Sequence, residues 1–134
     1  MKINCISEVI NRLKGILRKY GNLVIYVYDD MMNKYSLNLE ETAIERDVYW
    51  YWSDKVVLDN EECYDLNAEY TIKDLIKVLS DIMDKEGPNY PVVAINLYKG
   101  RITFCEVNTY EVNTSLNRLL ITGDIPEPED RDWL

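Results

Sequence analysis

The chain has 134 residues, of which 47% are apolar and 29% charged, values typical of a folded soluble domain and not of a disordered chain. Its net charge of −9 repels nucleic acid and anionic lipid and attracts basic partners. Histidine is absent, and the three cysteines form no CxxC pair, which excludes histidine-based general-base chemistry and disfavours a disulfide scaffold. No apolar run approaches the ~20 residues of a membrane span, so we expect a cytoplasmic protein with no membrane partner.

The first predicted element is an amphipathic helix over residues 6–21. Its apolar residues recur at spacings of three and four, which places them on one helical face. Ser7 or Asn4 is expected to cap its N-terminus, and Gly21 to end it. A strand is predicted next, at 23–28, because the chain turns apolar and β-branched there.

The chain is then predicted to turn back into a strand at 35–39, followed by an aromatic strand at 47–52 that turns into 55–58. Neighbouring side chains of a strand point to opposite faces, so the two tryptophans of 47–52 would face the core. The opposite face, with the matching residues of strand 23–28, would form an open surface rich in tyrosine, a residue type that dominates interface energetics. The residues expected there are Tyr26, Tyr28, Asp47, Tyr49 and Tyr51.

A second unit repeats this order. A helix is predicted over 72–87, capped by Thr71 and ended by Gly87, and a hairpin with its turn at Lys99-Gly100 follows it. The hairpin strands are 91–98 and 101–107; a further strand is expected at 109–112, and 115–121 is either a short helix or a strand. Residues 123–134 form an acidic tail with two prolines.

The two helices match at six apolar positions when the first is aligned with the second, and both end in Lys-x-Gly. The matched pairs are Ile6/Ile72, Val9/Leu75, Ile10/Ile76, Leu13/Leu79, Ile16/Ile82 and Leu17/Met83. The strands after them match with Leu23 aligned to Pro91. The sequence therefore predicts an α+β fold: one domain over 1–122, built from duplicated helix–strand–strand halves (1–66 and 67–122), with a mainly antiparallel sheet and both helices on one face.

Nothing in the sequence carries a catalytic motif, so we expect a protein that is not an enzyme and needs no cofactor or metal. An acidic run spans 59–69, and its spacing does not fit a calcium-binding loop. Carboxylates at phosphate-like spacing can occupy a basic nucleic-acid groove of another protein. The residues expected to do so are Asp59, Glu61, Glu62 and Asp65.

Basic residues surround the polar side of the first helix. Arginine forks to phosphate and tyrosine stacks on bases, so these residues with neighbouring tyrosines could form a pocket for a nucleotide. The residues in question are Arg12, Lys14, Arg18 and Lys19. The same residues would also fit ion pairs with the chain's own acids.

The stretch 13–30, which runs from the first helix through its glycine into a tyrosine-rich strand, resembles the opening of small acidic proteins of bacteriophages and mobile elements. That group includes counter-defence inhibitors such as anti-CRISPR proteins. The resemblance implies a stoichiometric binding protein and assigns no site residues.

These observations predict a non-enzymatic protein that inhibits a basic, nucleic-acid-handling host protein through acidic and tyrosine-rich surfaces, and that does not itself bind nucleic acid. Two alternatives stay open: a sponge for a nucleotide signal of a bacterial defence system, and an immunity protein that neutralises a basic toxin. The tyrosine face would also serve as a homodimer interface.

Overall fold

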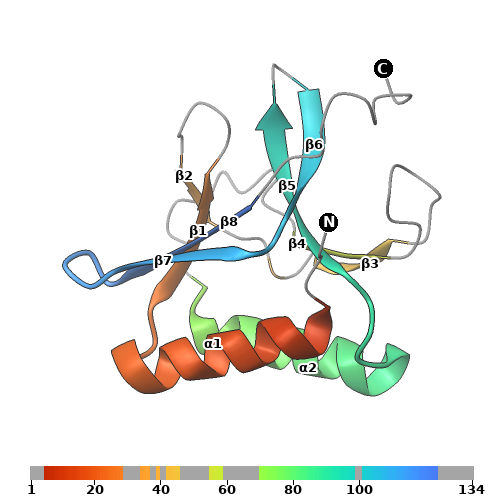
Figure 1. Ribbon diagram of the computed structural model, residues 1–134, viewed down its shortest axis with the longest axis horizontal. Helices are drawn as coiled ribbons and strands as arrows, with labels where there is room; N and C mark the ends of the chain where they lie inside the picture. Colours follow the sequence, from red (N-terminus) through yellow and green to blue (C-terminus); the bar gives the residue numbers. More distant parts are fainter. Residues whose placement is uncertain are drawn as a thin grey trace.

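The computed structural model describes residues 5–28, 34–36, 39, 42–45, 55–58, 70–98 and 101–123. These residues form two helices and eight strands (Figure 1). In chain order they are α1 (Ile6–Tyr20), β1 (Val24–Tyr28), β2 (Lys34–Ser36), β3 (Ala43–Glu45), β4 (Lys55–Leu58), α2 (Ile72–Glu86), β5 (Val92–Tyr98), β6 (Arg101–Glu106), β7 (Thr109–Asn113) and β8 (Arg118–Thr122).

Helix α1 begins one residue after Cys5, which is its N-cap, so the prediction of Ser7 as the cap is wrong, and Asn4 lies outside the described residues. The carboxylate of Glu8 accepts a hydrogen bond from the Cys5 backbone N–H at 3.5 Å. This third-residue acid satisfies a backbone donor at the helix start and favours the positive end of the helix dipole. The apolar spacing therefore located the helix correctly, whereas its N-cap is a cysteine and not one of the predicted oxygen-bearing residues.

Helix α2 is capped by Thr71, as predicted. The Thr71 hydroxyl accepts from the Asp74 backbone N–H at 3.4 Å, and the Asp74 carboxylate accepts from the Thr71 backbone N–H at 2.9 Å. Both helices end at a glycine with positive φ, Gly21 at 93° and Gly87 at 104°. Each glycine N–H donates to the carbonyl four positions before it, so both predicted helix ends are confirmed.

The strands form two four-stranded sheets, ordered β2-β1-β8-β7 and β3-β4-β5-β6, where the sequence predicted a single sheet. Four of the neighbouring pairs are antiparallel, whereas β1 with β8 and β4 with β5 are parallel. The α+β class is confirmed. The halves of the chain contribute strands to both sheets, a non-local pairing that side-chain patterns along one strand cannot reveal.

Most predicted strands are present in the described residues with small changes at their ends. The strands predicted at 23–28, 55–58, 91–98, 101–107 and 109–112 correspond to β1, β4, β5, β6 and β7. The segment 115–121 is divided between a turn at 114–117 and strand β8. Strand β3 was not predicted, and the aromatic strand predicted at 47–52 lies outside the described residues.

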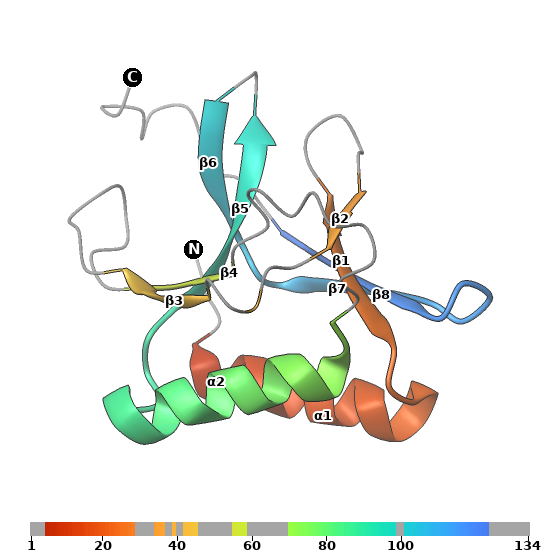
Figure 2. The ribbon, with the colours of Figure 1, turned by 180° about the vertical axis from the view of Figure 1, so that it is seen from behind.

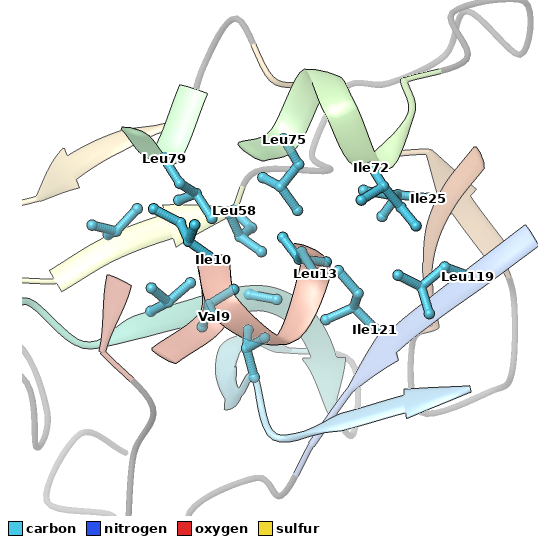
Figure 3. Close-up of a cluster of buried hydrophobic side chains, with 14 of the residues drawn as sticks. Val9, Ile10, Leu13, Ile25, Leu58, Ile72, Leu75, Leu79, Leu119 and Ile121 are labelled. Carbon is cyan, nitrogen blue, oxygen red and sulfur yellow. The ribbon is translucent and has the colours of Figure 1, made fainter. Parts of the chain in front are cut away.

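The helices lie side by side beneath both sheets, and β1 and β5 lead away from this helical layer (Figures 1 and 2). The core fills the space between helices and sheets (Figure 3). All six matched apolar positions of each helix belong to this core or pack against it. Strands contribute alternate residues to it, among them Ile25, Leu58 and Ile121, each fully buried.

Candidate binding surfaces

The four basic residues of α1 are exposed, but they divide into two groups. A helix turns about 100° per residue, so Arg12 and Lys19 lie near each other on one flank, while Lys14 and Arg18 lie roughly 120° away. The Lys19 ammonium sits 5.2 Å from the ring centroid of the adjacent Tyr20. The structure therefore does not gather the four into the single phosphate-binding pocket that the sequence predicted.

Arg12 lies at a hollow between α1 and the edge strand β7. The hollow has a cavity volume of about 410 Å³ and is lined by Glu8, Asn11, Arg12 and Tyr110. The guanidinium carbon of Arg12 lies 5.2 Å from the ring centroid of Tyr110, within the range of a cation–π interaction. The hollow thus combines hydrogen-bond donors, a carboxylate and an aromatic ring.

Tyr110 is the unusual group of this hollow. Its hydroxyl oxygen is buried and has no hydrogen-bond partner. Burial raises the pKa of Tyr110 from 10.0 to about 12; the Arg12 charge lowers that pKa and the Glu8 charge raises it further. The phenol is therefore protonated at neutral pH and retains an unused donor. Tyr110 was not predicted as a site residue from the sequence, although the alternation of exposed and half-buried residues along β7 places it on the helix side.

A second arginine–tyrosine contact joins β8 to β1. The guanidinium carbon of Arg118 lies 4.6 Å from the ring centroid of Tyr26. Tyr26 is half-buried and lies on the face of β1 opposite Leu23 and Ile25, which are buried in the core. Tyr28 belongs to β1, and its side chain lies outside the described part.

The remaining predicted partner-binding residues lie outside the described residues; they are Asp47, Tyr49, Tyr51, Asp59, Glu61, Glu62 and Asp65. Acidic and basic residues are nevertheless distributed unevenly between the described residues and the rest of the chain. The described residues hold eleven of the 15 basic and only eight of the 24 acidic residues. The helices and strands themselves are therefore net positive, and the acidity of the chain resides in the segments between and after them.

The position of the acidic segments follows from the strand directions. Strand β1 runs away from the helical layer (Figure 1) and is followed by Asp29-Asp30. Strand β8 is parallel to β1 and is followed by the tail. Strand β4, parallel to β5, is followed by the acidic run 59–69. Three acidic segments therefore begin at the carboxyl ends of parallel-paired strands, whereas Glu40-Glu41 comes after β2, which pairs antiparallel.

Within the described ranges no group of three or more His, Cys, Asp or Glu residues is arranged to hold a metal ion. The Cys5 sulfur lies 3.2 Å from the Ser7 hydroxyl oxygen and 3.3 Å from a Glu8 carboxylate oxygen, a contact explained by its capping position. No helix in the described part of the chain is long and apolar enough to cross a bilayer.

Comparison with protein-family models, with curated proteins and with solved structures finds no match to this chain. The features that bear on function are therefore the uneven distribution of charge, the two arginine–tyrosine contacts and the hollow beside α1.

Proposed function

We propose that this protein is a non-enzymatic inhibitor that occupies the basic, nucleic-acid-binding groove of a host protein, as counter-defence proteins of phages do. The observation that supports this proposal is the segregation of charge. The described helices and strands hold more bases than acids, and acidic segments of the sequence follow β1, β4 and β8. If the net charge of −9 served only solubility, we would expect acids to be spread over the helices and strands as well.

Concentrated carboxylates act in such a groove as the phosphates of a nucleic acid do. They replace a polyanion whose affinity comes largely from charge neutralisation, and they accelerate association through long-range attraction. The exposed bases of α1 would in turn repel a basic groove, so the partner is expected to approach from the side on which the parallel strands end.

The test compares two charge-matched variants. Asp59→Lys/Glu61→Lys changes the acidic run after β4, whereas Asp81→Lys/Asp84→Lys makes the same change in charge at exposed positions of α2. The probes are purified RNA-guided effector complexes of the bacterial host and, for the immunity alternative, basic nuclease toxins. Binding is measured by interferometry at several salt concentrations, with and without competing duplex DNA.

We expect the first variant to weaken binding of the cognate probe roughly tenfold and the control to change it less than about twofold, because only the first faces the partner. Duplex DNA should compete, and affinity should fall with salt. Binding that is indifferent to salt, to DNA and to the first variant would contradict the proposal. Selective binding of a nuclease toxin would assign the immunity function instead.

A second candidate function, capture of a nucleotide signal, is favoured by one observation, the hollow beside Arg12 and Tyr110. Arginine can fork to a phosphate, although the Glu8 carboxylate opposes a second negative charge. Isothermal titration with a panel of cyclic mono- and oligonucleotides tests it. Binding that is lost in Arg12→Ala and kept in Arg18→Ala would support it, and a panel that gives no heat would end it.

A further inference from the structure

The two sheets are built in the same way from opposite halves of the chain. The sheet that contains β1, the strand after α1, has the order β2-β1-β8-β7. The sheet that contains β5, the strand after α2, has the order β6-β5-β4-β3. In each, the strand that follows a helix pairs antiparallel with its own hairpin partner and parallel with a strand from the other half. Exchanging the halves therefore converts one sheet into the other.

The registers agree with this exchange. In the first sheet Ile25 lies opposite Leu119, and in the second Val92 lies opposite Val56. All four belong to the core. Ile25 thus corresponds to Val92, one position away from the match that the aligned sequences of the two strands predict. The two outer pairs agree as well, because Val112 opposite Leu119 corresponds to Ile44 opposite Val56.

The first residue of each helix also donates a backbone hydrogen bond to the other half of the chain. The Ile6 N–H donates to the Tyr90 carbonyl at 3.0 Å, and the Ile72 N–H donates to the Leu23 carbonyl at 3.0 Å. The two donors, Ile6 and Ile72, are a matched pair of the helix alignment. The two acceptors, Leu23 and Tyr90, are one position away from the strand alignment, as Ile25 and Val92 are. These bonds are reciprocal: the first residue of each helix is bound by a residue just before the strand of the other half.

The surface hollows follow the same relation. A hollow of about 350 Å³ beside α2 is lined in part by Asp74, Lys77 and Val78. In the helix alignment these three match Glu8, Asn11 and Arg12, which line the hollow beside α1. The residue that corresponds to Arg12 is Val78, which cannot make the cation–π contact. The two hollows thus lie at equivalent positions of the two helices, but the side chains that line them differ.

We infer that the two halves are two copies of one strand-exchanging unit, so that the surface joining them is the interface of a two-fold dimer contained in one chain. Amphipathic helices before strands are common and would explain the helical similarity alone. They do not explain why each half contributes its last two strands to the sheet of the other half. Nor do they explain why these strands have the same direction and place their core residues in the same register. A consequence is that any ligand of the Arg12 hollow binds once per chain.

The first test is a circular permutant of the full chain, in which residue 134 is joined directly to residue 1 and the chain opens between Glu69 and Tyr70. The inference requires that Ile121 be as far from Cys5 as Leu58 is from Thr71. In the permuted order the segments 122–134 and 1–4 join the first pair. Together they are longer than segment 59–70, which joins the second pair in the natural order, so no added linker is needed.

We expect the permutant to unfold cooperatively with a midpoint within roughly 10 °C of the parent, since every strand pair is retained. A permutant with the same junction but opened between Asp81 and Ile82, inside α2, should show no cooperative transition. That result confirms that the assay detects a broken unit.

The second test does not depend on the junction. The sequence of α2 replaces residues 6–20, once in register and once shifted by a single position. In register, the six matched apolar positions meet the core; the shift turns them by about 100°. An in-register chain that folds while the shifted chain does not would support the inference. An in-register chain no more stable than the shifted one, or a permutant opened at Tyr70 that fails to fold, would overturn it.

Discussion

Replacing Tyr110 by phenylalanine is expected to stabilise this protein, although the tyrosine lies under an arginine in a half-buried position. The hydroxyl is buried without a hydrogen-bond partner, and leaving such a group unpaired costs about 1–3 kcal/mol. Tyr110→Phe removes that group and keeps a ring for Arg12 to contact. We expect a gain of about 1 kcal/mol in the free energy of unfolding at pH 7.

The gain should grow at alkaline pH. The pKa of Tyr110 is about 12 in the folded protein and near 10 when unfolded, so between these values the unfolded state loses the phenolic proton first. The contribution of the tyrosine to stability is intact below pH 10 and falls as the pH rises to 12, by roughly 3 kcal/mol in all. The phenylalanine variant lacks this loss, so its advantage widens with pH.

Urea denaturation of both proteins at pH 7, 9, 10 and 11 measures this difference directly, because other titrating groups are common to both. Tyr20→Phe is the control: Tyr20 also lies beside a cation, but it is 41% exposed, and we expect a change below about 0.5 kcal/mol throughout. A Tyr110→Phe protein less stable than the parent at pH 7, with a gap independent of pH, would refute the reasoning, since it would mean that the hydroxyl has a partner.

Five further substitutions test the fold. Leu13→Ala, at a fully buried position in the core (Figure 3), should lower the free energy of unfolding by about 3 kcal/mol in denaturant titrations, and Lys14→Ala by less than about 0.5 kcal/mol. Gly21→Ala should cost about 1–2 kcal/mol because its φ is +93°; Gly15→Ala, at an open position inside α1, should gain up to about 1 kcal/mol, so opposite shifts in thermal midpoint are expected. Thr71→Ala should cost about 1 kcal/mol through the lost cap and increase amide exchange in the first turn of α2.

Much of the local structure could be predicted because it depends on neighbouring residues. The apolar spacing of residues 6–20 and the positive φ required at Gly21 and Gly87 fix both helices without reference to the rest of the chain. The division into two sheets could not be predicted. The alternation of Leu23, Ile25 and Tyr26 shows which side faces the core, but not that β8 lies beside β1.

The candidate site was only partly predictable for the same reason. Arg12 was identified by its charge, but what distinguishes it from Lys14 is its contact with the Tyr110 ring of β7. Tyr110 comes from β7, far along the chain from α1, and Tyr26, which was predicted as a surface tyrosine, contacts a different arginine. The sequence shows which arginines and tyrosines are present, but which arginine contacts which tyrosine depends on the tertiary structure.

The pairing of β1 with β8 also fixes the order in which the molecule can be completed during synthesis. Strand β1 can pair with its parallel neighbour β8 only after all the helices and strands between them have been made. The sheet containing β5 and β6 is complete once Glu106 has been added. A nascent chain therefore holds one finished sheet beside an unfinished one, and its slowest step is expected to be the pairing of β8 with β1, which closes a long loop.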